Sequence, residues 1–366
     1  MDFIDLKTQQ DRYRKEIESG IAAVLAHGRY INGPEIEKLE TELAKFVGAE
    51  YAIGVASGTD ALEIALRSLG IGPGDEVVTV PFTWISTAEA VALVGAKTVF
   101  VDIEADTYNI DLKLIEPAIT PRTKAIMPVN LFGQMIDYTA LNSLAEKHGL
   151  PVIEDAAQSF GATRDGRMSC ADTTIACTSF FPAKPLGCYG DGGALFTSDA
   201  QLDEKIRTIR NHGGMVRHHH TLVGMNGRLD TLQAAILLAK LPHFAGETEA
   251  RGRIGGRYSE LLDGVCGTPA IEKGNTHVYA QYTIRHPDRD GLGKFLKERG
   301  VPTAVYYPKC LHEQPVFEEL GYSLGDFPVS EKAAAEVISL PMHPFLSESD
   351  QDTVVEAIRE YTNAGA

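Results

Sequence analysis

Short apolar runs and longer amphipathic segments alternate along the first 245 residues. Two amphipathic segments come first, at residues 11–27 and 33–48, and each is expected to be a helix that ends at a glycine, Gly28 or Gly48. We expect the following β-rich apolar runs to be strands: 51–56, 76–80, 97–103, 124–130, 151–156, 173–180 and 193–197. Further helices are expected at 60–70, 87–95, 111–119, 138–149, 201–211 and 228–241. This order predicts an α/β fold whose mostly parallel sheet has helices on both faces.

The pattern changes after about residue 245. A long polar helix is expected at 244–263, and the alternation at 278–285 is typical of a half-exposed antiparallel strand. Helices are expected around it at 291–300, 329–339 and 348–361. The sequence therefore predicts two domains, a large one over 1–245 and a smaller C-terminal α/β domain over 246–366.

Composition narrows the class of protein. Lys and Arg number 34 and Asp and Glu number 50, which gives a formal net charge of −16 and argues against a nucleic-acid partner. The first residues do not have the pattern of a signal peptide, and no apolar run is long enough to cross a membrane, so we expect a cytoplasmic protein. The five cysteines have no zinc-type spacing and are expected to be reduced thiols. The run His218–His220 has no regular carboxylate partner, which favours a solvated loop over a metal site.

Three segments carry side chains of interest. In ASGTDALEIAL (56–66) a Ser-Gly-Thr turn joins a strand to a helix, which suits either a phosphate site or an ordinary helix cap at Ser57 or Thr59. In VIEDAAQSFGA (152–162) Asp155 stands at the end of an apolar strand, where open α/β folds bind ligands. Burying that carboxylate is costly unless it meets a cation.

The third segment is TSFFPAKPLGCYGDGGALF (178–196). Its Lys184 lies between Pro182 and Pro185 among apolar side chains, where desolvation lowers the pKa of an amine and makes it able to form a Schiff base. The alternative is a loop lysine whose charged head reaches solvent. Together, a phosphate site, a buried acid and a desolvated lysine are what pyridoxal 5′-phosphate (PLP) requires.

Several motifs in fixed order carry a resemblance that covers nearly the whole chain. They are INGPEIEKLE, SGTDAL, PFTWISTAEA, VDIEADTYNID, ITPRTKAI, EDAAQSFGA, SFFPAKPLG, GDGGA, GMNGRLDTLQAAIL and SLPMHPFL. The chain resembles the DegT/DnrJ/EryC family of sugar aminotransferases, within the fold-type I (aspartate aminotransferase-like) PLP enzymes. Family members that perform deoxygenation have His in place of the lysine, so Lys184 indicates an aminotransferase.

The resemblance implies a role for individual residues. Lys184 matches the lysine that forms the Schiff base, and Asp155 matches the partner of the pyridine nitrogen. The other matches are Gln158 near the ring hydroxyl, Trp84 stacked on the ring, Gly58, Thr59 and Ser179 as phosphate ligands, and Asn226 as a phosphate ligand from a second subunit. The last match implies a homodimer with shared active sites.

The resemblance also implies the substrates. L-glutamate is the expected amino donor, pyridoxamine phosphate is the expected intermediate form of the cofactor, and the acceptor is expected to be a UDP-linked 3-keto sugar acid, 2-acetamido-2-deoxy-3-oxo-glucuronic acid, of O-antigen biosynthesis. TDP-linked 3- or 4-keto sugars, a PLP-dependent lyase and a non-catalytic regulatory binder remain alternatives. Both substrates carry carboxylates, so Arg228 is the first candidate for a clamp. Weaker candidates for binding the sugar nucleotide are Tyr30, Tyr307 and His312. The segment Tyr306-Tyr307-Pro308 departs from the His-Tyr-Pro that is usual in the family.

Overall fold

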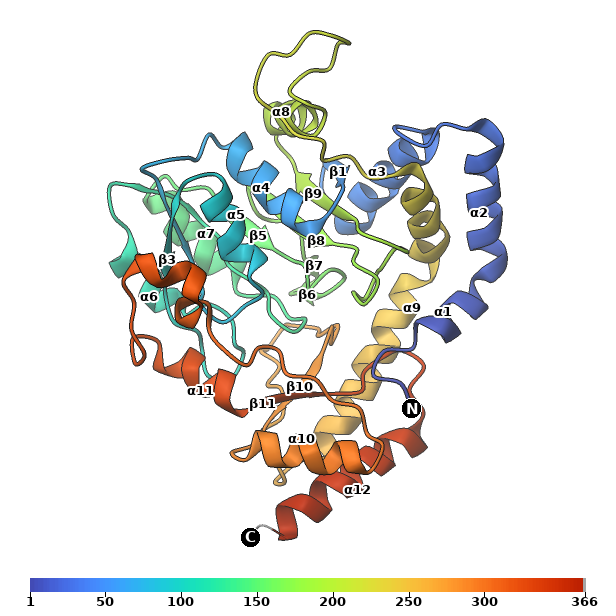
Figure 1. Cartoon of the computed structure of the whole chain (residues 1–366), viewed down its shortest axis with the longest axis vertical. Helices are drawn as coiled ribbons and strands as arrows, with labels where there is room; N and C mark the ends of the chain where they lie inside the picture. Colours follow the sequence, from blue (N-terminus) through green and yellow to red (C-terminus); the bar gives the residue numbers. More distant parts are fainter. Residues whose placement is uncertain (365–366) are drawn as a thin grey trace.

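The sheet at the centre of the molecule is built from two hydrogen-bonded groups of strands. The computed structural model describes residues 1–364 (Figure 1). One group has the order β1-β9-β8-β5 and the other β3-β2-β4. Parallel bridges from Ile126 to Val152 and from Val129 to Asp155 connect them, so the second group continues the first. The strand bounds are β1 Tyr51–Val55, β2 Glu76–Thr79, β3 Lys97–Phe100, β4 Thr123–Ile126, β5 Ile153–Asp155, β8 Ile175–Ser179 and β9 Gly193–Thr197.

The strand directions confirm the expected mostly parallel α/β sheet. Strand β2 pairs in parallel with β3 and β4, and β5 pairs in parallel with β8. Strand β9 is antiparallel to both of its neighbours, β1 and β8. Because β8 and β9 run in opposite directions, the glycine-rich turn between them is held at one end of the sheet. A two-stranded hairpin, β6 Thr163–Arg164 and β7 Arg167–Met168, lies outside this sheet.

Helices cover both faces of the sheet. The helix bounds before residue 262 are α1 Leu6–Arg12, α2 Arg14–His27, α3 Pro34–Val47, α4 Gly58–Ser68, α5 Ser86–Leu93, α6 Leu112–Ala118, α7 Tyr138–Lys147, α8 Ala200–Arg210 and α9 Thr231–Leu261. Buried side chains of α4, α5 and α8 share one apolar cluster with β1, β2 and β8, and those of α3 and α9 share another with β9. Both clusters remove apolar surface from water, which is the main stabilising term of such a fold.

The N-terminal helices largely follow the sequence pattern. Gly28 and Gly48 have φ values of 69° and 85° and end α2 and α3, as expected. The single helix expected over 11–27 is wrong, because the chain breaks at Tyr13 into α1 and α2. The ring of Tyr13 stacks on His243 at 4.1 Å and its hydroxyl donates to Glu247 of α9 at 2.8 Å. The residue that separates α1 from α2 is therefore held by two side chains of α9.

Helix α9 is continuous where two helices were expected, at 228–241 and 244–263. Pro242 lies inside it. A proline in a helix removes one backbone hydrogen bond and crowds the preceding turn. Leu237, Leu241 and Phe244 are buried on both sides of this proline, and their burial offsets that loss.

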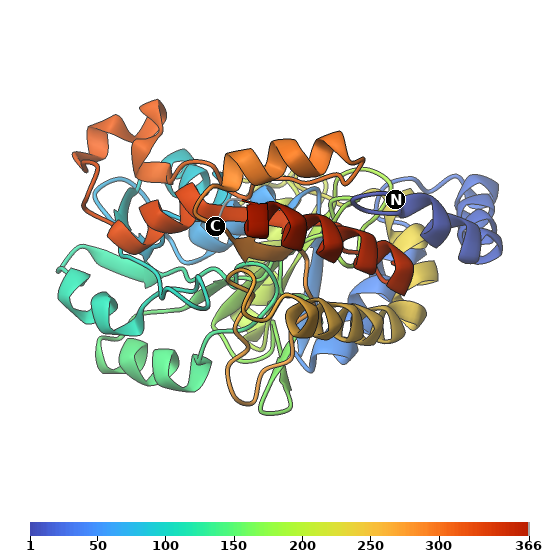
Figure 2. The same cartoon turned by 90° about the horizontal axis from the view of Figure 1, so that it is seen from below.

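The C-terminal part has its own apolar cluster, formed by α10, α12, β10 and β11. Its elements are β10 Tyr282–Arg285, α10 Arg289–Glu298, the 3-10 turns η1 Leu311–Glu313 and η2 Pro315–Leu320, α11 Pro328–Glu336, β11 Val337–Leu340 and α12 Glu348–Ala364. Figure 2 shows α10 (orange) and α12 (red) side by side. The expected antiparallel strand is confirmed by the β10–β11 pair.

One expected helix, 329–339, is wrong at its end. Residues 337–339 belong to β11, where the β-branched Val337 and Ile338 are buried opposite β10. The division into two domains at residue 245 stays a prediction, and α9 crosses that position without a break. Within residues 1–364, no helix combines the length and the apolar character that crossing a membrane requires.

Candidate active site

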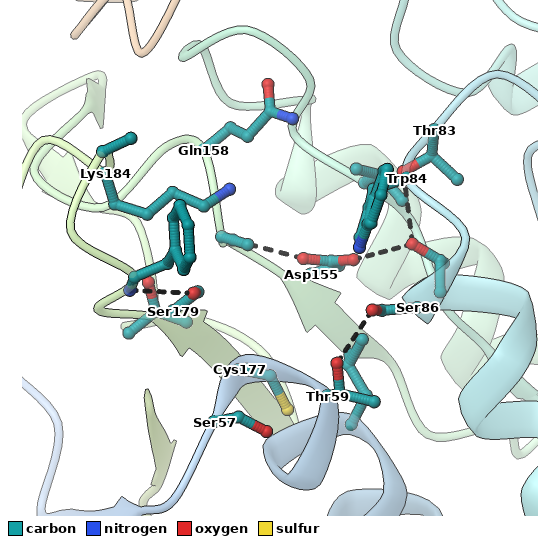
Figure 3. A pocket seen from close by; sticks show the side chains of 18 of the residues that line it. Ser57, Thr59, Thr83, Trp84, Ser86, Asp155, Gln158, Cys177, Ser179 and Lys184 are labelled. Carbon is teal, nitrogen blue, oxygen red and sulfur yellow. Dashed lines mark hydrogen bonds between the residues drawn. The ribbon is translucent and has the colours of Figure 1, made fainter. Parts of the chain in front are cut away.

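A cavity of about 400 Å³ opens at the carboxyl ends of the parallel strands (Figure 3). The segments that end or follow β1, β2, β4, β5 and β8 each contribute to its lining, with Ser57, Thr83, Val129, Asp155 and Ser179. Ligands of open α/β sheets bind at this edge. The remaining wall is formed by residues distant in sequence, Ile4, Gln281, Tyr306 and Tyr307.

Asp155 ends β5 and is 5% exposed. Its two carboxylate oxygens accept hydrogen bonds from neutral groups, the hydroxyl of Thr87 at 2.9 Å and the backbone N–H of Ala157 at 3.2 Å. Burial raises the pKa of Asp155, and these two bonds and the charge of Lys184 act against that rise. A buried carboxylate with neutral hydrogen-bond donors is suited to a cationic ligand atom.

Lys184 lies in the turn between β8 and β9, and its side chain extends into the cavity (Figure 3). The turn is held by hydrogen bonds from the backbone N–H of Lys184 to the carbonyl of Phe181 and from that of Cys188 to the carbonyl of Phe180, both 2.8 Å. Burial lowers the pKa of Lys184 to about 8, and the charge of Asp155 opposes that shift. An amine with such a pKa has a substantial neutral, nucleophilic fraction near neutral pH.

The start of α4 is open towards the cavity. Ser57 caps the helix, and its hydroxyl accepts a hydrogen bond from the backbone N–H of Asp60 at 3.0 Å, so the expected cap is present. The first N–H groups of a helix have no partner within it and can bind an anion. A Cβ on Gly58 would lie 2.7 Å from the Cβ of Ser179, so glycine is what allows the helix start to approach β8. Thr59 donates or accepts a hydrogen bond with Ser86 at 2.8 Å.

These residues fit PLP. The open turn of α4 and the hydroxyls of Thr59 and Ser179 suit its phosphate, and the buried carboxylate of Asp155 suits a protonated ring nitrogen. Lys184 extends into the same cavity, and Asp155 is the charged group that acts on its pKa. The structure thus brings together Lys184, Asp155, Gly58, Thr59 and Ser179, which lie far apart in the sequence.

An aromatic wall adjoins the carboxylate. Gln158 accepts a hydrogen bond from the backbone N–H of Phe132 at 2.8 Å and donates one to the hydroxyl of Tyr307 at 3.2 Å. Trp84 lines the cavity, is 57% exposed, and its ring centroid lies 5.9 Å from that of Tyr307. Gln158, Trp84 and Tyr307 therefore all lie at the predicted site.

Strand alternation separates two adjacent acids. Glu154 is fully buried but does not line the cavity, and it accepts hydrogen bonds from Asn130 at 2.8 Å and Ser169 at 2.7 Å. Burial raises the pKa of Glu154 to about 7, although these hydrogen bonds oppose the shift. Neighbouring residues of a strand point to opposite faces, so only Asp155 of these two acids reaches the cavity.

Three of the predicted residues do not line the cavity of their own chain. Asn226 is exposed, Arg228 donates to the side chain of Asn211 at 3.2 Å, and Tyr30 is 49% exposed. Asn226 pairs with Asn211 at the base of the loop 211–226, which projects beside α8 at the top of Figure 1, and Arg228 follows this loop. Tyr30 lies beside the next segment, where its carbonyl accepts a hydrogen bond from the backbone N–H of Thr231 at 2.9 Å.

His312 also lies away from the cavity. It is 5% exposed, and its ring lies 3.1 Å from a carboxylate oxygen of Glu331 and 4.8 Å from the ring of Phe327. The histidine run His218–His220 is exposed on the projecting loop, as expected. The five cysteines are free thiols.

The sequence reasoning missed several lining residues. Thr87, whose hydroxyl donates to Asp155, lies inside PFTWISTAEA in the first turn of α5, and its position near Trp84 in this motif is only a weak signal. Ile4 and Gln281 had no signal, because they come from segments far from the rest of the cavity in sequence and reach it through tertiary contacts.

Comparison with known proteins agrees with this geometry. The model of the DegT/DnrJ/EryC1/StrS aminotransferase family matches residues 11–359. A UDP-2-acetamido-2-deoxy-3-oxo-D-glucuronate aminotransferase of Pseudomonas aeruginosa is 55% identical, over 98% of this chain and 99% of that protein. A pleiotropic regulatory protein of Geobacillus stearothermophilus is 48% identical, over 98% of this chain and 97% of that protein. The crystal structure of Streptomyces venezuelae DesV in complex with a ketimine intermediate superposes with a TM-score of 0.97 and 41% identity, covering 99% of this chain and 98% of that one.

Proposed function

The chain belongs to the DegT/DnrJ/EryC1/StrS aminotransferase family, and we propose that it moves the amino group of L-glutamate to C3 of UDP-2-acetamido-2-deoxy-3-oxo-glucuronic acid. The products are UDP-2-acetamido-3-amino-2,3-dideoxy-glucuronic acid and 2-oxoglutarate, in the synthesis of O-antigen sugars. The observation that carries the proposal is the amine of Lys184 in one cavity with the buried carboxylate of Asp155 and the open start of α4. The 55% identical relative, named for this acceptor, supports the choice of sugar.

PLP, when bound, withdraws electrons from the carbon atom that loses a proton. The buried carboxylate of Asp155 would keep the ring nitrogen protonated, and its burial would keep this pair away from water. Nζ of Lys184 would take a proton from Cα of L-glutamate and, once the acceptor is bound, would deliver a proton to C3 of the sugar. A pKa of about 8 lets this amine act as both base and acid near neutral pH. Gln158 and Trp84, which line the cavity, would help to orient the cofactor.

Three of the predicted residues do not line the cavity of their own chain, and we assign them to the cavity of a second copy of the chain. Asn226, Arg228 and Tyr30 lie near one exposed loop, and a two-fold dimer would present them to the partner's cavity. There Asn226 would bind the cofactor phosphate, and Arg228 would clamp a substrate carboxylate with two hydrogen bonds. Tyr307 contributes from the same chain. His312 is left out, because Glu331 and Phe327 already surround its ring.

TDP-linked keto sugars remain the alternative acceptors. A purely regulatory role, suggested by the name of the 48% identical relative, would leave the Lys184 and Asp155 pair without a use. A lyase would use the same pair, and differs in its products.

The test uses ¹⁵N-labelled L-glutamate. The purified protein with PLP is given the labelled donor and, in separate reactions, the UDP-linked 3-keto sugar acid or a TDP-linked keto sugar, and the products are analysed by mass spectrometry. We expect ¹⁵N in the sugar nucleotide and an equal amount of 2-oxoglutarate. A dehydrated sugar without ¹⁵N would indicate a lyase, and labelled TDP-linked sugar with unlabelled UDP-linked sugar would indicate the alternative acceptor.

A further inference from the structure

One side-chain oxygen in the cavity wall has no partner. Gln281 lines the cavity, and its Oε1 atom is buried without a hydrogen-bond donor among residues 1–364. Buried polar atoms are nearly always hydrogen-bonded, since an unsatisfied acceptor destabilises the fold. An acceptor of this kind in a cavity wall indicates a ligand that donates a hydrogen bond to it.

An apolar side chain belongs to the same wall. Ile4 lines the cavity, and the residue before it, Phe3, accepts a backbone hydrogen bond from Met342 at 3.1 Å. The ring of Phe3 also lies 6.3 Å from that of Tyr306, another lining residue. These contacts fix the N-terminal segment against the C-terminal part, where Figure 1 places the N-terminus.

The backbone brings Gln281 close to this segment. Strand β10 begins at Tyr282, which lies opposite Leu340 of β11, so Gln281 and Met342 extend two paired strands. Arg251 donates from Nη1 to the carbonyl of Tyr279 at 2.9 Å and to that of Met342 at 3.5 Å. This buried guanidinium ties the two extensions together, and Met342 in turn binds Phe3.

The geometry points to a subsite for the 2-acetamido group of the acceptor sugar, in which Gln281 accepts a hydrogen bond from the amide N–H and Ile4 contacts the methyl group. The inference rests on the proposed function. A carboxylate has no donor for Oε1 of Gln281, and a sugar hydroxyl has no methyl group for Ile4. The acetamido group is the part of that substrate that offers a neutral donor and an apolar end together.

Binding can be tested without turnover. UDP-2-acetamido-2-deoxy-glucuronic acid and UDP-glucuronic acid differ at C2, and each keeps a 3-hydroxyl, so neither has the 3-keto group that amination requires. Calorimetry on the protein loaded with PLP measures both dissociation constants. We expect wild type to bind the acetamido ligand more tightly, and Gln281→Leu to weaken that ligand about 10-fold with little change for UDP-glucuronic acid.

Further variants separate the subsite from a general effect on folding. Gln281→Met keeps the length of the side chain and should have the same effect as Gln281→Leu. Ile4→Ala should weaken the acetamido ligand about 3- to 10-fold. Matched controls are Gln314→Leu and Leu6→Ala, which do not line the cavity and should leave both dissociation constants unchanged. Thermal unfolding confirms that each variant is folded.

The outcomes are distinct. Equal weakening of both ligands by Gln281→Leu and Gln281→Met, or no weakening of either, would overturn the subsite and leave the proposed function in place. If wild type binds neither ligand, both the proposed UDP-linked acceptor and the acetamido subsite are rejected. A preference for the acetamido ligand that disappears in the Gln281 and Ile4 variants supports both.

Discussion

Two lysines with lowered pKa values lie at the same glycine-rich turn: Lys184 is part of the turn, and Lys240 contacts it from α9. Burial lowers the pKa of both Lys184 and Lys240 to about 8. Lys240 lies on α9 and is 2% exposed, and its Nζ donates to the carbonyl of Gly187 at 2.6 Å and lies 4.3 Å from the ring centre of Tyr189. Lys184 instead extends into a cavity with Asp155.

The difference shows that a lowered pKa does not by itself identify a reactive lysine. The amine of Lys240 is already bound by a carbonyl and an aromatic ring, which is how proteins accommodate a buried cation. The amine of Lys184 has space in front of it for a ligand and a carboxylate in the same cavity. Access and the neighbouring acid, rather than the pKa, assign the chemistry to Lys184.

The largest expected effect separates the two lysines by activity. Lys184→Ala should lower turnover of L-glutamate by about 10⁴-fold or more, because it removes the group that moves the proton. Lys240→Met, which replaces a buried amine with an apolar chain of similar length, should keep turnover within about 10-fold. Steady-state assays of both variants, loaded with PLP, measure this ratio. Comparable losses in the two variants would mean that Lys184 has no special role.

A smaller effect is expected at the phosphate end of the cavity. Gly58→Ala should weaken PLP binding about 10- to 100-fold, because the new Cβ would lie 2.7 Å from the Cβ of Ser179 and force the two elements apart. Gly246→Ala is the control, since a Cβ there meets no atom within 4 Å. Fluorescence titration of each protein with PLP gives the dissociation constants, and unchanged affinity in Gly58→Ala would remove the α4 start from the site.

The smallest effect concerns stability and pH. In the folded protein without PLP the pKa of Lys184 is about 8, below that of a lysine in an unfolded chain, so its charged form destabilises the folded state. That cost is complete below pH 8 and is relieved as the pH rises towards about 10.4. Relative to Lys184→Met, the free energy of unfolding of wild type should therefore increase by roughly 3 kcal/mol across this window.

Denaturant unfolding at several pH values measures this difference. The difference between wild type and Lys240→Met should change with pH by a similar amount, because the pKa of Lys240 is also about 8. Added PLP should abolish the slope that depends on Lys184 and preserve the slope that depends on Lys240. If PLP leaves the pH dependence of the difference between wild type and Lys184→Met unchanged, this would contradict a bond between Lys184 and PLP.

Local sequence predicted the three segments that bring Lys184, Asp155 and the start of α4 to the cavity. Three features were visible within single segments: the prolines beside Lys184, the strand end at Asp155 and the Ser-Gly-Thr turn. Each depends on neighbours in the sequence and not on distant contacts. The burial of Lys240 was not predictable in this way, because it depends on the packing of α9 against a turn about 50 residues earlier. The part of the wall formed by Ile4 and Gln281 depends on contacts between the ends of the chain.

The architecture was predictable to a similar extent. Strand β9 matches the expected residues, but its antiparallel direction is decided by pairing with β1 and β8, which no local pattern reports. Two helices were predicted where α9 is continuous, because the apolar contacts that keep the helix intact around Pro242 are tertiary. Local sequence patterns thus predicted which residues form helices and strands better than they predicted the direction of a strand or the continuity of a helix.

The most direct test of the central claim is to reduce the protein with borohydride in the presence of PLP and to map the modified peptides by mass spectrometry. Borohydride fixes the cofactor to the amine that holds it. The account predicts modification at Lys184 and none at Lys240, with no modification of this turn in Lys184→Ala. Modification at Lys240 with Lys184 unmodified would contradict it.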